Sequence, residues 1–459
     1  MLHHGFNMFS FKERLMSGLV FPLYHMLRKD GVMSAIKRMD KSQWKSQAEL
    51  REIQSIKLQN LLHHCHKHVP YYRDIFSQQG IRFEDDFPAI LNNVPVITKP
   101  LINANRDLLI ADNFDMGDLV ANSTGGSTGE SMYFYNDRTS LVERQAVVLR
   151  NQKWVGARYS DKEVRLWGAQ MDLNKASGLR SKVHGLLNNT IHLSTYDLSD
   201  DSMHNYVKVI SRYKPKLLIS YPSPLAEFSR YIISNSINIH PVKSIITSAE
   251  KLYDWQREVI QLAFPKSEIY DRYGCREFGN IAHECNMHEG YHVNDERFFL
   301  EILDDNLQPV DEGKVGKIYI TDLDNYGFPF LRYEIGDLAS FSSKSCSCGR
   351  GLSLLSSIEG RSFDIIQCPN GNRVAGTFWT ICLRRYQGVV RFQVVQEELD
   401  VLRLKLVTDE SYDKSSESQI ISDVYDKCGK ISVVFDYVDV IELTKSGKEK
   451  LVVSNIRDN

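Results

Sequence analysis

The chain lacks a long uninterrupted apolar run and a secretory leader pattern. Its N-terminal segment, MLHHGFNMFSFKERLMSGLVFPLYHML, is broken by Lys12, Glu13 and Arg14, and no stretch approaches the ~20 apolar residues that span a bilayer. We therefore expect no membrane-spanning helix. The N-terminal segment is interpreted either as a helix packed on the body of the protein or as an amphipathic helix on a membrane surface. Membrane association is thus expected to be peripheral at most.

The sequence also lacks an excess of charge of either sign and a disulfide framework. Its 56 Lys and Arg residues against 58 Asp and Glu residues give a net charge of −2, which argues against a globally basic, nucleic-acid-binding protein. Eight cysteines are spread over 459 residues, unlike the dense pattern of small secreted domains. These absences favour a cytoplasmic protein without a nucleic-acid partner.

Strand and helix patterns alternate in the middle of the chain. After an amphipathic pattern that predicts a helix over 47–68, apolar segments at 216–220, 242–247 and 267–273 indicate buried strands separated by helices. This alternation predicts a mostly parallel sheet with helices on its faces. In such sheets ligands bind beyond the carboxyl ends of the strands, where the loops YPS, SAE and YGCRE follow.

The pattern changes twice after residue 290. Residues 290–360 show strands with little helix between them, which predicts an antiparallel β subdomain. The remaining residues indicate two strands, a helix and another strand. We therefore expect an α/β protein with a large N-terminal domain over 1–362, which includes the antiparallel subdomain, and a small α+β C-terminal domain over 363–459.

Residues 122–131, NSTGGSTGES, combine three glycines with five hydroxyl residues. Backbone N–H groups in such a turn can converge on an anion because no Cβ blocks the approach, and the hydroxyl groups add further donors. The segment is not a Walker A loop, since Glu130 follows Gly129 where that motif has lysine, and the next residues, MYFY, indicate a strand. Taken alone, the loop is interpreted either as a phosphate-binding loop or as an exposed turn.

Four further motifs follow this loop: SAE at 248–250, YGCREFG at 273–279, RYEIGD at 332–337 and TKSGKEKL at 444–451. In this order and spacing the five motifs resemble the adenylate-forming superfamily of acyl-CoA synthetases, luciferases and peptide synthetases. Within it they are most similar to the phenylacetate–CoA ligase group and its CapK-type members from polysaccharide gene clusters. The resemblance extends from about residue 50 to the end, and it implies that the small C-terminal domain is mobile.

The resemblance implies an AMP-forming ligase. Such an enzyme joins a carboxylic acid to ATP, releases pyrophosphate, and transfers the acyl group to a thiol of coenzyme A or a carrier phosphopantetheine, or to an amine. The CapK-type likeness implies a role in polysaccharide or cell-envelope biosynthesis. Two alternatives stay open: another transferase with the same nucleotide pocket, and a nucleotide-binding protein of this fold that has lost ligase activity.

The resemblance also implies which residues bind ATP. The hydroxyl and glycine residues of the loop correspond to those that hold the β- and γ-phosphates, SAE and YG to those that flank adenine, and an aspartate and an arginine to those beside the ribose. The implied set is Ser123, Thr124, Gly125, Gly126, Ser127, Thr128, Gly129, Ser248, Ala249, Glu250, Tyr273, Gly274, Asp337 and Arg361.

Three single residues have implied roles in the chemistry. Glu277 corresponds to the Mg²⁺ ligand, because a hard cation on phosphate oxygens needs a carboxylate. Lys448 corresponds to the catalytic lysine, whose ammonium offsets negative charge during attack, and Asp364 corresponds to the hinge. The sequence departs from the family twice: no lysine follows the glycine-rich loop, and Arg276 replaces the usual threonine or serine.

Cysteine and histidine residues indicate a separate zinc site. Cys285, Cys346 and Cys348 with one histidine complete a tetrahedral Cys₃His set. His292 is preferred to His288 because GYH recurs in the resembled group. Four protein ligands leave no open position on the metal, so the zinc is expected to be structural. The alternative is a set of reduced, partly buried cysteines.

Overall fold

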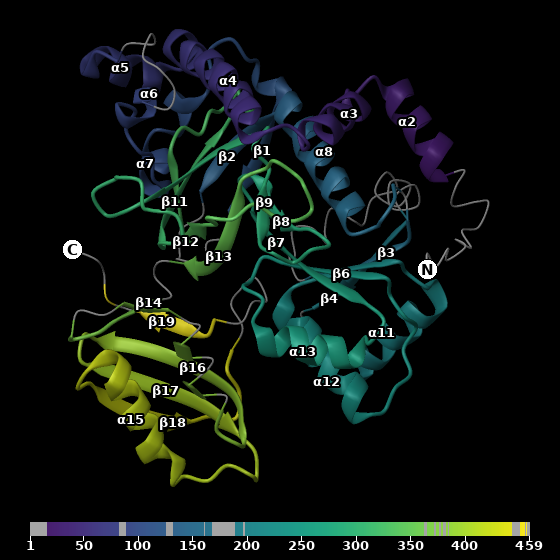
Figure 1. Cartoon of the computed structure of the whole chain (residues 1–459), viewed down its shortest axis with the longest axis vertical. Helices are drawn as coiled ribbons and strands as arrows, with labels where there is room; N and C mark the ends of the chain where they lie inside the picture. The colour runs from purple at the N-terminus through teal and green to yellow at the C-terminus, as the bar shows by residue number, and fades with distance from the viewer. Residues whose placement is uncertain are drawn as a thin grey trace. The chain divides into compact units, whose positions relative to one another are not determined.

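The computed structural model divides into two compact units (Figure 1). The first comprises Met1–Glu301, Tyr319–Glu334 and Phe341–Ser356, and the second Ile302–Ile318, Ile335–Ser340 and Ser357–Asn459. The predicted domain boundary near residue 362 stays a prediction. The residues that the structure describes are 16–81, 89–124, 132–159, 161–167, 189–195, 198–361, 365–370, 373–375, 378–379, 382–383, 385–442, 450–454 and 456.

Helices form the N-terminal part of the first unit. The predicted helix over 47–68 is α4, whose first turn is fixed by a capping box between Ser46 and Glu49. Pro70 begins the next helix, because proline fits the first turn but not a helix interior. The helices and short turns up to residue 118 are η1 (Met16–Val20), α2 (Phe21–Arg28), α3 (Val32–Ser42), α4 (Gln47–His68), α5 (Pro70–Gln79), α6 (Ala89–Asn92), α7 (Lys99–Ala104), η2 (Arg106–Leu109) and η3 (Met116–Asp118). Over the described residues, no helix is both long enough and apolar enough to cross a membrane.

An eleven-stranded sheet has the order β10-β11-β12-β13-β9-β8-β7-β6-β5-β3-β4. Strands β4, β3, β5, β6 and β7 are parallel to one another. Strand β8 is antiparallel to β7 and to β9, and β9 is antiparallel to β13. The predicted α/β fold is confirmed. The strands are β3 (Glu163–Trp167), β4 (Thr190–Ser194), β5 (Leu217–Ser220), β6 (Ser244–Ser248), β7 (Glu268–Cys275), β8 (Gly279–Glu284), β9 (Tyr291–Val293), β10 (Phe298–Leu303), β11 (Gly316–Asp322), β12 (Tyr333–Phe341) and β13 (Leu354–Arg361).

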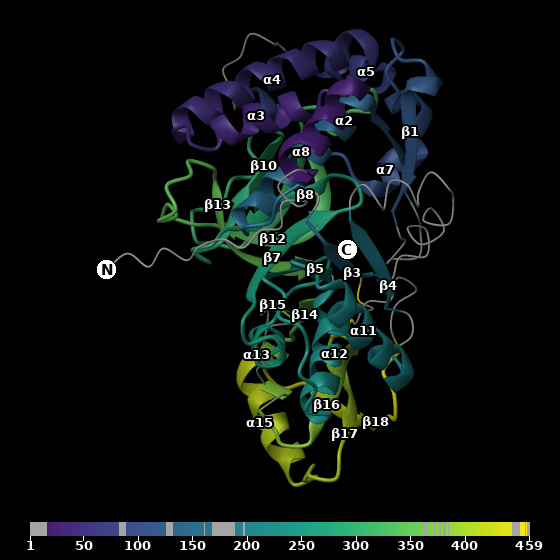
Figure 2. The same ribbon diagram turned by 90° about the vertical axis from the view of Figure 1, so that its right-hand side faces the viewer.

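Three helices cover one face of the parallel strands, as both views show (Figures 1 and 2). These are α11 (Asp200–Tyr213), α12 (Pro222–Ser234) and α13 (Asp254–Ala263). Alternate strand residues point toward them, and the shared core contains Val164, Leu218, Ile245, Ile269, Ile210, Phe228 and Ile260. On the opposite face, a second cluster includes Ile219, Ile246 and Tyr270 with residues that follow α8 (Arg138–Trp154).

A β-hairpin carries the glycine-rich loop. Strand β1 (Leu119–Ser123) is antiparallel to β2 (Tyr133–Asp137), so the strand predicted after the loop is confirmed. Thr124 and Met132 extend the pairing beyond the last strand pair: Thr124 N–H donates to the Met132 carbonyl at 2.9 Å, and Met132 N–H donates to Thr124 Oγ1 at 2.9 Å. The two ends of the loop are therefore held together.

The C-terminal part of the second unit is α+β, as predicted. One helix lies along a four-stranded sheet (Figures 1 and 2) of order β18-β17-β16-β19. The edge strand β19 is parallel to β16, which the sequence pattern did not predict. The elements are β14 (Ile365–Gln367), β15 (Arg373–Ala375), β16 (Val389–Glu398), β17 (Val401–Thr408), α15 (Ser416–Cys428), β18 (Ser432–Tyr437) and β19 (Val452–Ser454).

Candidate functional site

The SAE and YG motifs lie side by side at the carboxyl ends of β6 and β7. Ser248 is the last residue of β6 and pairs with Arg272, one residue before Tyr273. Ala249 then adopts a φ of 70°, a left-handed conformation that is unusual for a residue other than glycine. Glu250 Oε2 accepts a hydrogen bond from the Ser223 N–H at 3.1 Å. The parallel sheet thus brings together two motifs that are more than twenty residues apart.

The YGCRE motif forms a tight turn between β7 and β8. A Cβ on Gly274 would lie 2.1 Å from the Gly279 carbonyl oxygen, so the turn requires glycine there. Gly279 has a φ of 76°, and a Cβ on it would lie 2.6 Å from Arg144 Nε. Arg144 Nη1 donates to the Arg276 carbonyl at 3.1 Å and to the Glu277 carbonyl at 3.4 Å. Arg144 therefore holds the backbone of this turn in place.

The same turn carries Arg276, which contacts the hairpin, and Glu277, which contacts Tyr333. The Glu277 side chain is buried, and its Oε1 accepts a hydrogen bond from Tyr333 OH at 3.4 Å. Arg276 Nε donates to Asn122 Oδ1 at 3.1 Å, and Asn122 immediately precedes the predicted ATP-binding residues. The guanidinium thus lies at the start of the glycine-rich loop, and the carboxylate of the next residue lies beside Tyr333. A carboxylate of this kind can bind Mg²⁺ together with phosphate oxygens.

The structure describes only some of the predicted ATP-site residues. Ser123 and Thr124 lie at the end of β1, Asp337 is half-buried in β12, and Arg361 ends β13 with a side chain outside the described part. Outside the described residues are Gly125, Gly126, Ser127, Thr128, Gly129, Asp364 and Lys448.

Arg144, Asn122 and Arg272 are candidate functional residues that sequence reasoning missed. Arg144 and Asn122 contact residues more than 130 positions away. Arg144 stands in no recognisable motif, and Asn122 begins the NSTGGSTGES segment but was given no role there. Arg272 had a usable signal: alternation along β7 places it on the same face as Tyr270, and its cross-strand partner is Ser248. Burial lowers the pKa of both Arg144 and Arg272 to about 10, so each remains a cation at neutral pH.

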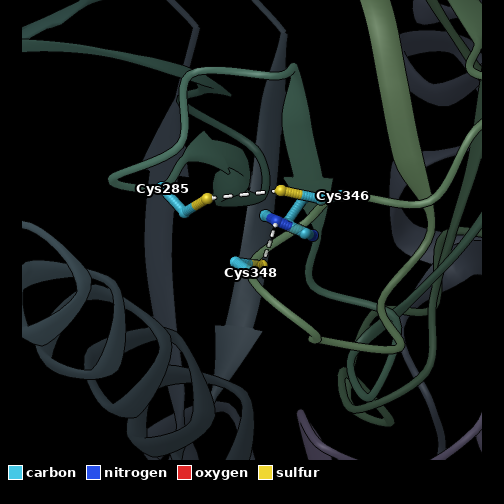
Figure 3. A group of neighbouring side chains, drawn as sticks. Cys285, Cys346 and Cys348 are labelled. Atoms are coloured by element: carbon cyan, nitrogen blue, oxygen red, sulfur yellow. Dashed lines mark hydrogen bonds between the residues drawn. The ribbon is translucent and has the colours of Figure 1, made fainter.

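The second candidate site is a cluster of three cysteines and one histidine. The ligand atoms of Cys285, His292, Cys346 and Cys348 all lie within 4.8 Å of one another. Cys285 follows β8, His292 lies in β9, and the two other cysteines lie between β12 and β13. Figure 3 shows the three cysteine side chains beside one another. His288 instead contacts Glu284 at 3.4 Å. The structure therefore brings together the four predicted zinc ligands.

The spacing of these atoms fits zinc. Cys285 Sγ lies 3.6 Å from Cys346 Sγ, and Cys348 Sγ lies 3.3 Å from His292 Nε2. Zinc–ligand bonds of about 2.3 Å to sulfur and about 2.0 Å to nitrogen give tetrahedral edges of roughly 3.5 to 3.8 Å. Burial lowers the pKa of His292 to about 4, so the imidazole is neutral as a ligand must be.

Two of the sulfur atoms each accept a hydrogen bond from a backbone N–H group. The Met287 N–H donates to Cys285 Sγ at 3.4 Å, and the Arg350 N–H donates to Cys348 Sγ at 3.5 Å. Glu289 accepts two hydrogen bonds of 2.7 Å from Ser347, between the two cysteines of the CSC segment. Such outer contacts fix the orientation of metal ligands.

Comparisons with known proteins agree with the motifs. Residues 366–455 match the family model of the CapK C-terminal domain. The chain is 24% identical to Protein CapK of Staphylococcus aureus over 89% of this chain and 90% of that protein. It is 23% identical to a phenylacetate-coenzyme A ligase of Thermus thermophilus over 82% of this chain and 85% of that protein.

Its fold is similar to that of a solved 2-hydroxyisobutyryl-CoA ligase in the postadenylation state in complex with R3-HIB-AMP. The TM-score is 0.74 at 16% identity, over 91% of this chain and 92% of that one. The predicted resemblance is confirmed: the chain is similar in sequence to CapK and to phenylacetate–CoA ligases, its fold is similar to that of a solved CoA ligase, and residues 366–455 match the CapK C-terminal domain.

Proposed function

We propose that this chain is an ATP-dependent, AMP-forming ligase that activates a carboxylic acid as an acyl-adenylate. One observation carries the proposal: the SAE motif, the YGCRE turn and the start of the glycine-rich hairpin meet beyond the carboxyl ends of parallel strands, where ligands of such sheets bind. Support comes from the similar fold of a ligase solved with R3-HIB-AMP.

The first step would place the acid in line with the α-phosphate of ATP. An oxygen of the carboxylate attacks the α-phosphorus, and pyrophosphate leaves with the electron pair of the broken P–O bond. Glu277 would hold Mg²⁺, which offsets charge on the triphosphate. Asp337 would accept hydrogen bonds from the ribose hydroxyls, and Lys448 would offset negative charge in the transition state.

In the second step, a thiolate of coenzyme A or a carrier phosphopantetheine attacks the acyl carbonyl, and AMP leaves. The similarity to a phenylacetate-coenzyme A ligase supports this acceptor. The CapK-type resemblance of the motifs is the ground on which we also propose a role in polysaccharide or cell-envelope biosynthesis, where an amine is the alternative acceptor. We further propose that residues 363–459 form a mobile domain, with Asp364 as its hinge, that brings Lys448 to the nucleotide.

Exchange of labelled pyrophosphate into ATP tests the first step, because it needs the acid but no acceptor. We expect exchange with at least one acid of a chemically diverse panel, and a loss of about 10²- to 10³-fold in Lys448→Ala. ATP binding without exchange for any acid would instead support the alternative, a nucleotide-binding protein without ligase activity. Product masses with added thiol or amine then identify the acceptor.

We also propose that Cys285, His292, Cys346 and Cys348 hold a structural zinc ion. The four donors and their spacing support zinc, and they leave no open position for catalysis. Elemental analysis is expected to find one zinc per chain, lost in the double variant Cys346→Ser/Cys348→Ser. His288→Ala is the matched control and is expected to keep the metal. A protein purified without chelators that contains no zinc would refute this site.

A further inference from the structure

One face of the parallel strands carries a row of aromatic and polar side chains at the carboxyl ends. Trp167 ends β3, Tyr221 directly follows β5, Ser248 ends β6, and Arg272 is the residue of β7 paired with Ser248. The register of β3, β5 and β6 places these positions at the same level of the sheet. They point away from the helices α11 to α13, because the adjacent positions pack against those helices.

An apolar surface forms one end of this row. The rings of Trp167 and Tyr221 lie with their centroids 4.3 Å apart at an interplanar angle of 40°. Tyr221 is buried, and Trp167 is half-buried and packs against the cluster around Ile246. Aromatic surface of this kind suits a flat or ring-shaped apolar group.

A guanidinium forms the other end. Arg272 Nε donates to Ser248 Oγ at 3.1 Å, and in the described part of the chain no carboxylate forms an ion pair with Arg272. Glu163, on the same face, is already paired with Arg165 and accepts a hydrogen bond from Gln152 Nε2 at 3.1 Å. The charge of Glu163 favours the charged form of Arg272 from a distance, but the two form no direct ion pair in the described part of the chain.

Asp271, the sequence neighbour of Arg272, lies on the opposite face. Its carboxylate accepts hydrogen bonds from Thr247 Oγ1 at 2.6 Å and from Tyr291 OH at 2.9 Å. Burial, together with the nearby Arg165, lowers the pKa of Arg272 to about 10. A half-buried guanidinium that forms no direct ion pair with a carboxylate carries a desolvation cost that a bound anion can offset.

We propose that the acid substrate carries a second anionic group, which binds Arg272, and a flat apolar body, which lies toward Trp167 and Tyr221. Guanidinium groups bind carboxylates through two parallel N–H donors, and among the described residues only Nε of Arg272 has a hydrogen-bond partner. The proposal rests on the ligase function above. The substrate class is then a ring-bearing dicarboxylic acid, of which one carboxylate is activated and the other stays ionised.

Pyrophosphate exchange with matched acids tests this specificity. The probes are phenylacetate with 3- and 4-carboxyphenylacetate, and benzoate with isophthalate and terephthalate. We expect at least one diacid to have a KM about 10-fold or more below that of its monoacid. Arg272→Leu is expected to raise the KM of that diacid by about 10- to 100-fold, the effect of losing a charged hydrogen bond, and to abolish the preference.

Three further variants separate recognition from folding. Arg272→Lys keeps the charge and is expected to retain part of the diacid preference, and Ser248→Ala is expected to weaken it because the guanidinium loses its anchor. Arg230→Leu is the matched control, since Arg230 pairs with Glu227 on α12 and should leave the ratio of the two KM values unchanged.

The outcomes distinguish the two proposals. Exchange with monoacids and diacids at equal KM, or an Arg272→Leu variant that raises both values equally, refutes the diacid specificity and leaves the ligase function intact. A folded, ATP-binding chain that exchanges with no acid refutes the ligase function and this inference together. If Arg272→Leu does not fold, the same comparison in Arg272→Lys decides.

Discussion

The guanidinium of Arg350 lies over the indole ring of Trp154, with its Cζ 4.7 Å from the ring centroid. The same Cζ lies 4.9 Å from the ring centroid of Trp44, and Gln43 Oε1 accepts hydrogen bonds from Arg350 Nε at 3.0 Å and from Trp154 Nε1 at 2.7 Å. Because Arg350 is two residues from Cys348, the proposed zinc loop is attached to the corner between α3 and α4.

Removal of zinc is therefore expected to change the environment of two tryptophans. A strong chelator should shift the tryptophan emission, lower the Tm by several degrees, and mobilise Arg350. Arg350→Ala is expected to reproduce the emission change while it keeps the zinc, because the metal ligands stay in place. Intrinsic fluorescence and elemental analysis on the same samples check this. An emission spectrum insensitive to both changes would contradict the link.

Arg276 is expected to bind phosphate in place of the lysine that the glycine-rich loop lacks. Its Nε contacts Asn122 at the start of the loop, and a guanidinium is suited to phosphate oxygens. Arg276→Ala should raise the KM for ATP in pyrophosphate exchange by about 10- to 100-fold, through loss of one charged hydrogen bond. Arg73→Ala, which removes a surface arginine paired with Asp112, is the control and should leave this KM unchanged. If Arg276→Ala and Arg73→Ala had the same KM for ATP, a role of Arg276 in phosphate binding would be ruled out.

Gly274→Ala is expected to disrupt the YGCRE turn. The new Cβ would lie 2.1 Å from the Gly279 carbonyl oxygen, so the hairpin backbone must shift and the position of Glu277 with it. Crowding of this kind costs about 1–3 kcal/mol, and exchange activity should fall more steeply than the Tm. Gly117→Ala is the matched control, since a Cβ on Gly117 would meet no atom within 4 Å. A variant with wild-type exchange would show that the turn tolerates the shift.

Asp324 is expected to make the stability depend on pH. Lys57 Nζ donates to both of its carboxylate oxygens, at 2.7 and 3.0 Å, yet burial raises the pKa of Asp324 to about 6 from an ordinary 3.8. The folded state thus holds the proton more tightly than the unfolded state. This contribution, about 3 kcal/mol at most, is complete below pH 4 and is lost as the pH rises through 6.

Urea unfolding between pH 4 and pH 7 checks this dependence. Asp324→Asn should flatten the decline in the unfolding midpoint over that range, because the amide does not titrate. Asp305→Asn, at an exposed carboxylate paired with Lys317, should keep the wild-type slope. Parallel curves for wild type and Asp324→Asn would count against the raised pKa.

Periodicity was enough to predict the regular elements. The helix over 47–68 coincides with α4, and the strands expected at 216–220, 242–247 and 267–273 correspond to β5, β6 and β7 within two residues at each end. Apolar residues recur in these segments with the period of the element that buries them. Strand β19 has only three residues, too few for a period to be visible.

The sequence predicted the site residues that lie in short motifs. It did not predict the residues that reach the site through contacts between distant parts of the chain. The positions of the cysteines indicated the zinc set, and the GYH segment of the resembled group selected His292, which is the histidine that the structure brings to the cluster. The contacts of Arg276 with Asn122 and of Arg144 with the YGCRE turn join residues 132 to 154 positions apart. Such pairs arise from the packing of the hairpin and α8 against the sheet, which no local pattern encodes.

The pairing of β19 with β16 affects how the C-terminal end can be altered. Val452, Val453 and Ser454 cover the backbone edge of β16 at Val394, Val395 and Gln396. A chain shortened before residue 452 would leave that edge open to strands of other molecules, and self-association would follow. If such a truncated chain lost activity, the cause could be aggregation as well as the absence of Lys448. A substitution of Lys448 alone avoids this ambiguity.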